Sequence, residues 1–120
     1  MAGVVYVPWY ATVLRQDAFA EQVVAIAPLA LRYGATKYQV HVSRDDRYKI
    51  TQMSWFESPK DWYRYWDGPE MIEFRRRNSG RFQVPIVYGW HEELATGELG
   101  PEVPLPERSP EPEPVPQASG

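Results

Sequence analysis

The spacing of apolar residues divides the chain before Leu94 into six segments of strand or helix character. Four segments are rich in β-branched and aromatic residues, and two carry apolar residues at helical intervals. In chain order the segments are residues 4–14, 18–31, 37–43, 48–56, 58–78 and 82–92. Their order is strand, helix, strand, strand, helix, strand. This order predicts an α+β fold, a ferredoxin-like βαββαβ sandwich in which one antiparallel sheet carries both helices on one face.

The first strand, residues 4–14, has apolar side chains on both of its alternating faces, which is typical of a strand covered on two sides. In a ferredoxin-like sheet this strand is central. Pro8 has no amide hydrogen to donate to a neighbouring strand, so it fits poorly at a central position. Pro8 indicates an edge position or a β-bulge, and a bulge would resolve the misfit at a central position.

The first helix has clear signals at both ends. Asp17 is a good N-cap for a helix that begins at Ala18. Pro28 should kink this helix or end it near Ala27, and Gly34 fits a left-handed position after it. The apolar stripe expected to face the core is Ala20, Val23, Val24, Ala27 and Leu31.

The next segments predict a hairpin and a helix that is broken in two. The polar sequence RDDR at residues 44–47 is a compact turn between two strands. Ser58 and Pro59 form a strong helix start, and residues 67–69 (DGP) should interrupt the helix after Trp66. Residues 82–92 then predict a last strand with Val84, Ile86, Tyr88 and Trp90 on one face.

Composition separates a folded region from a tail. All 17 aromatic residues precede residue 95, and seven of the 12 prolines follow residue 100. The charge is +1 over residues 1–94 and −4 over residues 95–120. We expect one domain over residues 1–94 and a disordered, Pro- and Glu-rich tail over residues 95–120, with polyproline character and an unknown partner.

The same counts argue against several classes of protein. A nearly neutral domain lacks the dense basic surface that nucleic acid requires. The chain has no cysteine, which excludes disulfides, thiolate metal sites and a cysteine nucleophile. It shows no basic-then-apolar leader and no apolar run near the length of a membrane span. We expect a cytoplasmic protein that binds neither nucleic acid nor membrane.

Aromatic residues gather in one short stretch that predicts a ligand site. The stretch contains Trp55, Phe56, Trp62, Tyr63, Tyr65 and Trp66. On a helix, Trp62 and Trp66 share a face, and against a strand that carries Tyr48 and Gln52 they form a flat apolar slot for a planar molecule. The alternative is that these rings are simply the core of a small domain.

The two histidines are the other candidates for chemistry. His91 lies at the end of the last predicted strand beside Glu92, which could orient it as a general base for a phenolic or enolic substrate. His41 lies among polar residues on a strand face that could join two subunits. A surface or interface role is the simpler explanation for both. The histidines are roughly fifty residues apart without a paired carboxylate motif, so we expect no metal site.

The segment from Trp55 to Trp62 (WFESPKDW), followed by Glu70-Met71 and Arg75, resembles the antibiotic biosynthesis monooxygenase family. The resemblance covers about residues 3–93. It implies a dimeric α/β barrel, a homodimer whose pockets each lie between the sheet and the helices of one subunit. Activities of the family include cofactor-independent oxidation of anthrone-like and quinol substrates by O2, and oxidative haem degradation.

The haem-degrading branch of that family pairs an Asn on the first strand with a Trp and a His on the second helix. Here residues 4–13 contain no Asn, Trp66 could stand for the Trp, and the place of the His falls near Arg75. The missing His argues against haem.

The resemblance and the aromatic stretch together predict a cofactor-independent monooxygenase-like protein that oxidises a planar phenolic, quinol or polyketide-type substrate. The predicted site residues are His91 as base and Trp62, Trp66, Tyr48 and Gln52 around the substrate. The alternatives are a non-catalytic dimeric ligand-binding or interaction module, and an isomerase or cyclase of the same fold.

Overall fold

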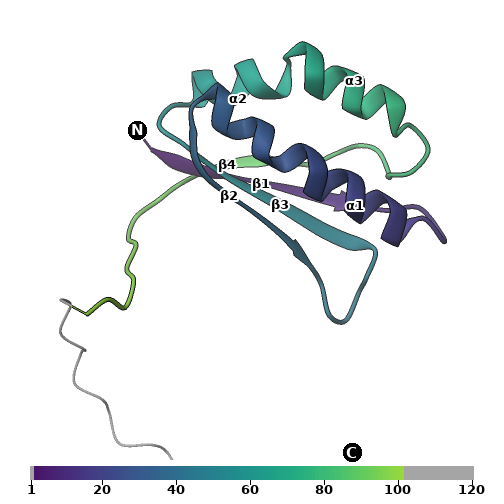
Figure 1. Cartoon of the computed structure of the whole chain (residues 1–120), viewed down its shortest axis with the longest axis horizontal. Helices are drawn as coiled ribbons and strands as arrows, with labels where there is room; N and C mark the ends of the chain where they lie inside the picture. The colour runs from purple at the N-terminus through teal and green to yellow at the C-terminus, as the bar shows by residue number, and fades with distance from the viewer. Residues whose placement is uncertain (1, 102–120) are drawn as a thin grey trace, which may run out of the picture.

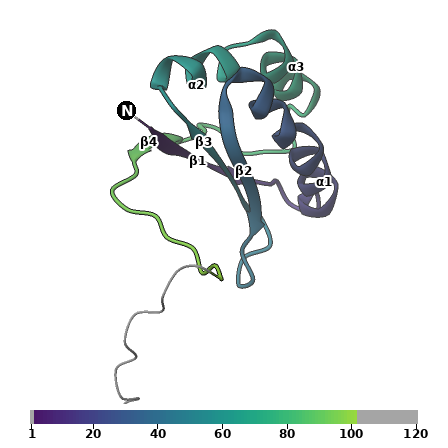
Figure 2. The same cartoon turned by 60° about the vertical axis from the view of Figure 1, so that its left-hand side comes forward.

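The sheet of this protein is four-stranded and antiparallel, in the order β2-β3-β1-β4. The computed structural model describes residues 2–101. The elements are β1 (Gly3–Tyr10), α1 (Gln16–Ile26), the 3-10 helix η1 (Ala27–Tyr33), β2 (Ala35–Val42), β3 (Lys49–Phe56), α2 (Pro59–Trp66), α3 (Pro69–Arg77) and β4 (Gly89–Glu92). All helices lie on one face of the sheet (Figure 1). The turned view in Figure 2 shows the same two layers. The predicted α+β ferredoxin-like sandwich is confirmed.

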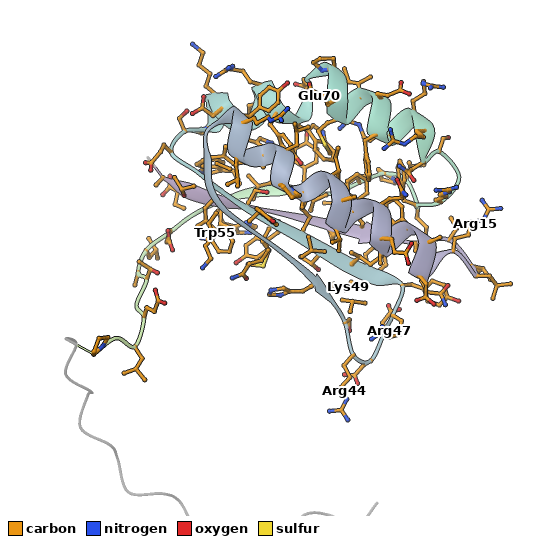
Figure 3. All side chains as sticks on the ribbon, viewed as in Figure 1. Arg15, Arg44, Arg47, Lys49, Trp55 and Glu70 are labelled. Carbon is orange, nitrogen blue, oxygen red and sulfur yellow. The ribbon has the colours of Figure 1, made fainter. Side chains whose placement is uncertain are left out.

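Alternation along β3 separates the two faces of the sheet. Ile50, Gln52, Ser54 and Phe56 are buried, at no more than 1% exposure, because they point into the layer beneath the helices. The residues between them are half-buried on the opposite face. On that face the described residues place no helix, and Figure 3 shows Trp55 on this side. Any site between sheet and helices is therefore lined by the first set.

The centre of the core is the ring of Trp9, which is fully buried on β1. Its ring centroid lies 5.5 Å from that of Phe19 on α1 and 5.7 Å from that of Phe74 on α3. It also lies 5.1 Å from Phe82 and 5.6 Å from Trp66. One strand residue thus joins both helical segments to the sheet, mostly through tilted or edge-on contacts that aromatic rings prefer.

The expected β-bulge at Pro8 is wrong. The register between β1 and β3 runs without a shift, and Pro8 pairs directly with Thr51. On its other side β1 pairs with β4 only from Gly3 to Tyr6. Pro8 therefore lies where one side of β1 has no paired strand, and a residue without an amide hydrogen is tolerated there. The only register shift among the paired strands falls between Ala35 and Lys37 of β2.

The first helix begins earlier than predicted. α1 starts at Gln16 with Arg15 as its N-cap, and Asp17 lies in the first turn, where its charge favours the helix dipole. Pro28 ends the α-helix as expected, because η1 starts at Ala27. Gly34 has the predicted left-handed conformation, with φ of 101°.

The face of α1 and η1 that packs on the sheet differs partly from the predicted stripe. Val23 and Ala27 are buried as expected, whereas Val24 and Leu31 are about half exposed. Phe19 is fully buried and belongs to the core cluster, whereas Ala20, which the prediction placed on the buried stripe, is only partly buried. The helix is therefore rotated toward Phe19, which is drawn into the cluster around Trp9.

The hairpin and the broken second helix are confirmed. β2 and β3 are joined by residues 43–48, which include the predicted turn. The Ser58 side chain accepts a hydrogen bond from the Asp61 amide at the start of α2, with Pro59 in the first turn. α2 ends at Trp66, and Gly68 precedes α3 as its N-cap.

The predicted last strand is much shorter than residues 82–92. β4 contains only Gly89–Glu92, and Phe82 makes an isolated bridge with Ala11. Residues 83–88 have no regular secondary structure. Pro85 lies within this segment, and because it has no amide hydrogen it cannot extend the hydrogen-bond ladder of β4. This irregular segment carries Tyr88, which the site below requires.

Residues 93–101 leave the sheet without forming a strand or helix. Most of the predicted tail lies outside the described residues, so its predicted disorder and partner stay predictions. Within residues 2–101, no helix is long and apolar enough to cross a membrane.

Candidate functional site

Trp62 and Trp66 form a stacked pair on the inner face of α2. Their ring centroids are 5.1 Å apart and their planes differ by 22°. Spacing of four residues on one helix brings them together, as the sequence predicts. Both rings are nearly buried, with exposures of 2% and 5%. The predicted open slot is therefore closed in this conformation.

Tyr88 closes the Trp62–Trp66 pair from the solvent side. Its ring centroid lies 5.4 Å from that of Trp62 and 5.1 Å from that of Trp66. Tyr88 is 36% exposed, far more than either tryptophan. It belongs to the irregular segment before β4, where no ladder of strand hydrogen bonds holds it. A planar ligand that reaches the tryptophans has to replace this ring.

A chain of buried hydrogen bonds lies beside the stacked pair. The indole Nε1 of Trp9 donates to Gln52 Oε1 at 3.0 Å, and Gln52 Nε2 donates to the Tyr65 hydroxyl oxygen at 2.9 Å. Gln52 is fully buried, so these bonds satisfy an amide that would otherwise be costly in an apolar layer. The Tyr65 hydroxyl keeps its own proton and can donate it to a ligand oxygen.

The Tyr65 hydroxyl is a donor and not a base at neutral pH. Burial raises its pKa to about 12, while the hydrogen bond from Gln52 and the charge of Arg75 act in the lowering direction. A phenol with this pKa stays protonated across the physiological range. A role in proton abstraction from substrate is therefore excluded for Tyr65 near pH 7.

This raised pKa predicts a loss of stability in alkaline solution. The folded state holds the Tyr65 proton more tightly than the unfolded state, whose tyrosine pKa is 10.0. The stabilisation is complete below pH 10 and is lost as pH rises through about 12, by about 3 kcal/mol. Denaturant unfolding of wild type and Tyr65→Phe between pH 7 and 11.5 measures it.

Tyr65→Phe should be less stable than wild type at pH 7, by about 1–3 kcal/mol, because Gln52 Nε2 loses its acceptor. The gap should narrow above pH 10. Tyr63→Phe, on the exposed side of α2, is the matched control and should follow the wild type. A constant gap between wild type and Tyr65→Phe at every pH would contradict the assignment.

Arg75 on α3 places its guanidinium over the ring of Trp66. Its Cζ atom lies 4.2 Å from the Trp66 ring centroid, within the range of a cation–π contact. Its Nη2 donates to the Trp66 carbonyl oxygen at 2.9 Å, which caps the end of α2. Its Nη1 is buried and has no acceptor among the described residues. Burial lowers the pKa of Arg75, whereas Asp67, Tyr88 and Tyr65 raise it.

Ser54 provides a second unpartnered polar atom in the same layer. Its hydroxyl is buried without a hydrogen-bond partner within residues 2–101. On β3 it lies between Gln52, which contacts Tyr65, and Phe56, whose ring packs on Trp62 at 5.9 Å. The layer between sheet and α2 is therefore apolar with a few polar groups, which is the usual composition of a small-molecule site.

The structure brings together three of the five predicted site residues. Trp62, Trp66 and Gln52 line the same layer, with Tyr65 linking Gln52 to α2. Tyr48 precedes β3 at the end of the strand opposite Phe56 and makes no ring contact with either tryptophan in the described region. Its predicted place beside the tryptophans does not fit this arrangement.

His91 does not reach the site within one chain. It pairs with Val4 in the sheet, and its ring packs edge-on against Tyr6 at 4.6 Å on the helix-free face. The tryptophans lie on the other side of the sheet, so His91 is not placed to take a proton from a ligand held there. His41 also lies on the helix-free face, hydrogen-bonded to Gln39 at 3.0 Å.

Sequence reasoning missed Trp9, Tyr65, Arg75 and Tyr88 as members of this group. Trp9 and Tyr65 carried a usable signal, since a tryptophan or tyrosine buried in a core needs a partner for its polar hydrogen. Tyr88 was assigned to a strand, and Arg75 was named as part of the family resemblance. The described residues contain no group of three His, Cys, Asp or Glu side chains that could hold a metal ion.

No protein-family model matches the sequence, and neither does any curated protein. Solved structures do match the fold. A protein from Nitrosomonas europaea, provisionally named an antibiotic biosynthesis monooxygenase, superposes with a TM-score of 0.70 at 16% identity over 78% of this chain and 90% of its own. The chain shares the fold of this structure.

Two further structures with this fold are similar to the chain. SnoaB, a cofactor-independent oxygenase from Streptomyces nogalater, has a TM-score of 0.67 at 10% identity over 79% of this chain and 95% of its own. Rv0793 from Mycobacterium tuberculosis has a TM-score of 0.70 at 12% identity over 82% of this chain and its full length. At these identities the likeness establishes the fold alone, and the chemistry has to be argued from the side chains.

Proposed function

We propose that this protein is a cofactor-independent oxygenase that oxidises a planar phenolic or quinol-type substrate with O2. The observation that carries the proposal is the Trp62–Trp66 stack closed by the displaceable ring of Tyr88. A planar substrate in place of Tyr88 would keep the same ring contacts. The likeness to SnoaB, a cofactor-independent oxygenase, supports the choice of chemistry.

The reaction fits a site that binds an anion and excludes water. A substrate carbon bearing two hydrogens takes one oxygen atom from O2 and becomes a carbonyl, and the second oxygen leaves with the two hydrogens as water. O2 is the oxidant, so the balance needs no other reagent. An electron-rich phenolate or enolate transfers the first electron to O2, and the apolar layer around the tryptophans shields the intermediates from solvent.

Within this layer the substrate anion has to form without a side chain that accepts its proton near pH 7. Tyr65 remains protonated below pH 10, and His91 lies on the other face of the sheet. The positive charge of Arg75 over Trp66 stabilises an anion nearby and lowers the pKa of a bound phenol. The Tyr65 hydroxyl, which stays protonated, would donate a hydrogen bond to the developing oxyanion.

A ligand-binding module without turnover is the second candidate. It is favoured by the near-complete burial of Trp62 and Trp66, because a filled core explains two buried rings without any reaction. The two candidates differ in one observable. Both predict saturable binding of planar phenols, and only the oxygenase consumes O2.

The helix-free face of the sheet supports a homodimer. Val4, Tyr6, Tyr10, Met53 and Trp55 alternate on this face, where no helix of residues 2–101 covers them; Lys37 lies over the Trp55 ring, and the His91 ring packs on Tyr6. Tyr10 is 38% exposed. Exposed apolar area on one side of a sheet favours association with a second copy. Sedimentation equilibrium should give twice the chain mass of 13.9 kDa, and a monomer at micromolar concentration would contradict the dimer.

A ligand screen followed by oxygen uptake tests the proposed function. Anthrone, 1,4-dihydroxynaphthalene and related planar phenols should raise the melting temperature, and at least one should be oxidised by the metal-free protein with O2 uptake. Stabilisation without uptake would favour the binding module. If no planar ligand stabilises the protein, the tryptophans are core and the proposal fails.

A further inference from the structure

Neither binding of a neutral ring nor packing fully explains Arg75. Its guanidinium is stacked on Trp66, it approaches Tyr88, and its Nη1 is buried with no acceptor in the described part of the chain. We propose that the site selects aromatic ligands that carry an anionic oxygen group, such as a carboxylate, and that Arg75 Nη1 donates to that group. The inference rests on the proposed ligand site at Tyr88.

Arg75 is half-buried as a residue, but its Nη1 is buried, and a buried donor of a charged group without a partner is costly because desolvation disfavours the charged form. Only two ion pairs occur among residues 2–101, Arg64–Asp61 and Arg76–Glu73. Arg75 takes part in neither pair, although Arg76, the next residue of the same helix, pairs with Glu73. Arg75 therefore has no paired carboxylate within residues 2–101, which leaves its charge available to an anionic ligand.

Asp67 is the competing acceptor. It follows α2 directly and raises the pKa of Arg75 through its charge, together with Tyr88 and Tyr65. Asp67 is exposed and makes no ion pair with Arg75. An exposed carboxylate at a distance contributes little, because water screens it. A ligand carboxylate inside the layer would contact Nη1 directly and would be desolvated with it, which makes the contact stronger.

The geometry links the ring and the charge of a single ligand. The guanidinium lies 4.2 Å from the Trp66 centroid, and the Tyr88 ring lies 5.1 Å from the same centroid. Trp66 thus contacts both the guanidinium and the ring of Tyr88, so a ligand ring in the place of Tyr88 would share this indole with Arg75. The ligand class is a planar phenol or quinol with an acidic substituent on or next to the ring.

Arg75 also has a structural role, because its Nη2 caps the Trp66 carbonyl. Loss of affinity alone would not separate the two roles. The ratio of affinities for an anionic ligand and its neutral analogue does separate them, because the cap affects both ligands equally. Arg75→Lys keeps the charge and loses the paired donors, whereas Arg75→Gln loses the charge.

The test is calorimetric titration with 1-hydroxy-2-naphthoate and 1-naphthol, which share the ring system and differ in one carboxylate. The full chain should bind the naphthoate at least about tenfold more tightly, the range of a charge-assisted hydrogen bond. Arg75→Gln should remove most of this preference, and Arg75→Lys should keep part of it. Arg77→Gln is the matched control and should keep the preference. Arg77 is the last residue of the same helix and does not stack on Trp66.

Raising the salt concentration from 50 to 500 mM should weaken only the naphthoate in the wild type, a result that needs no variant to fold. Equal binding of the two compounds, binding of neither, or a preference that survives Arg75→Gln overturns the inference. O2 uptake is measured separately. Selective binding of the naphthoate without O2 uptake supports the anion site and contradicts the oxygenase. O2 uptake with neutral phenols, without selectivity for the anionic ligand, supports the oxygenase and contradicts the anion site.

Discussion

Trp9→Ala is expected to lower the free energy of unfolding by about 5 kcal/mol, enough to leave a domain of this size largely unfolded. The ring of Trp9 is fully buried and contacts the rings of Phe19, Trp66, Phe74 and Phe82. Its loss leaves a large cavity and also removes the donor to Gln52. Urea unfolding followed by far-ultraviolet circular dichroism measures the change.

Trp9→Phe separates these two causes. A phenyl ring keeps much of the packing but leaves Gln52 Oε1 without a donor, so we expect a loss of about 1–3 kcal/mol. Tyr63→Ala, at 51% exposure on α2, is the control and should cost less than about 1 kcal/mol. If Trp9→Ala were as stable as the Tyr63 variant, Trp9 would not be the centre of the core.

Tyr88→Ala and Trp66→Leu should change catalytic efficiency in opposite directions. Removing the Tyr88 ring frees the place of the substrate, so kcat/KM should rise about tenfold through a lower KM, the scale of two lost ring contacts. Trp66→Leu keeps an apolar side chain but removes the surface that orients the ring. Its kcat/KM should fall on the order of 100-fold, as misplacement of a reacting ring can cost.

Val87→Ala is the matched control for Tyr88→Ala. Val87 lies in the same irregular segment and is 73% exposed, so its loss should leave kcat/KM unchanged. Melting temperatures of all three variants show whether Trp66→Leu remains folded. A fall in kcat/KM for Tyr88→Ala would mean that Tyr88 binds the substrate and does not cover its site.

The sequence predicts those elements whose signals are local. Ser58 and Pro59 begin α2, the DGP sequence at residues 67–69 separates α2 from α3, and Gly34 ends η1. The RDDR turn joins two strands of clear alternation. These signals depend on backbone conformations and caps, which a few neighbouring residues determine. The pairing of Trp62 with Trp66 was predictable for the same reason.

Features that depend on the neighbours of a strand were not predictable. Pro8 indicated a bulge, yet a short β4 leaves its amide side unpaired. Residues 82–92 alternate like a strand, but Pro85 breaks the ladder and frees Tyr88. His91 is separated from the tryptophans because sheet register alone decides which face a residue takes, and one residue of offset reverses it.

The prediction from sequence left out members of the site because buried hydrogen bonds join residues that are far apart in the chain. Gln52 was expected to line an open slot. In the structure its amide is shared between Trp9 and Tyr65, which are 43 and 13 residues away in the chain. Contacts at such separations have no local signal. They also hold the Tyr65 hydroxyl oxygen against Gln52 in the layer between the sheet and α2.

The most direct test of the proposed oxygenase is turnover under 18O2 with purified, metal-free protein and no added cofactor. A planar phenol or anthrone that stabilises the protein should be converted to a product that carries one 18O atom, with one O2 consumed for each product formed. The rate should follow protein concentration and should fall with Trp66→Leu. A stabilising ligand that is returned unchanged, or oxidised no faster than in buffer, would contradict the account.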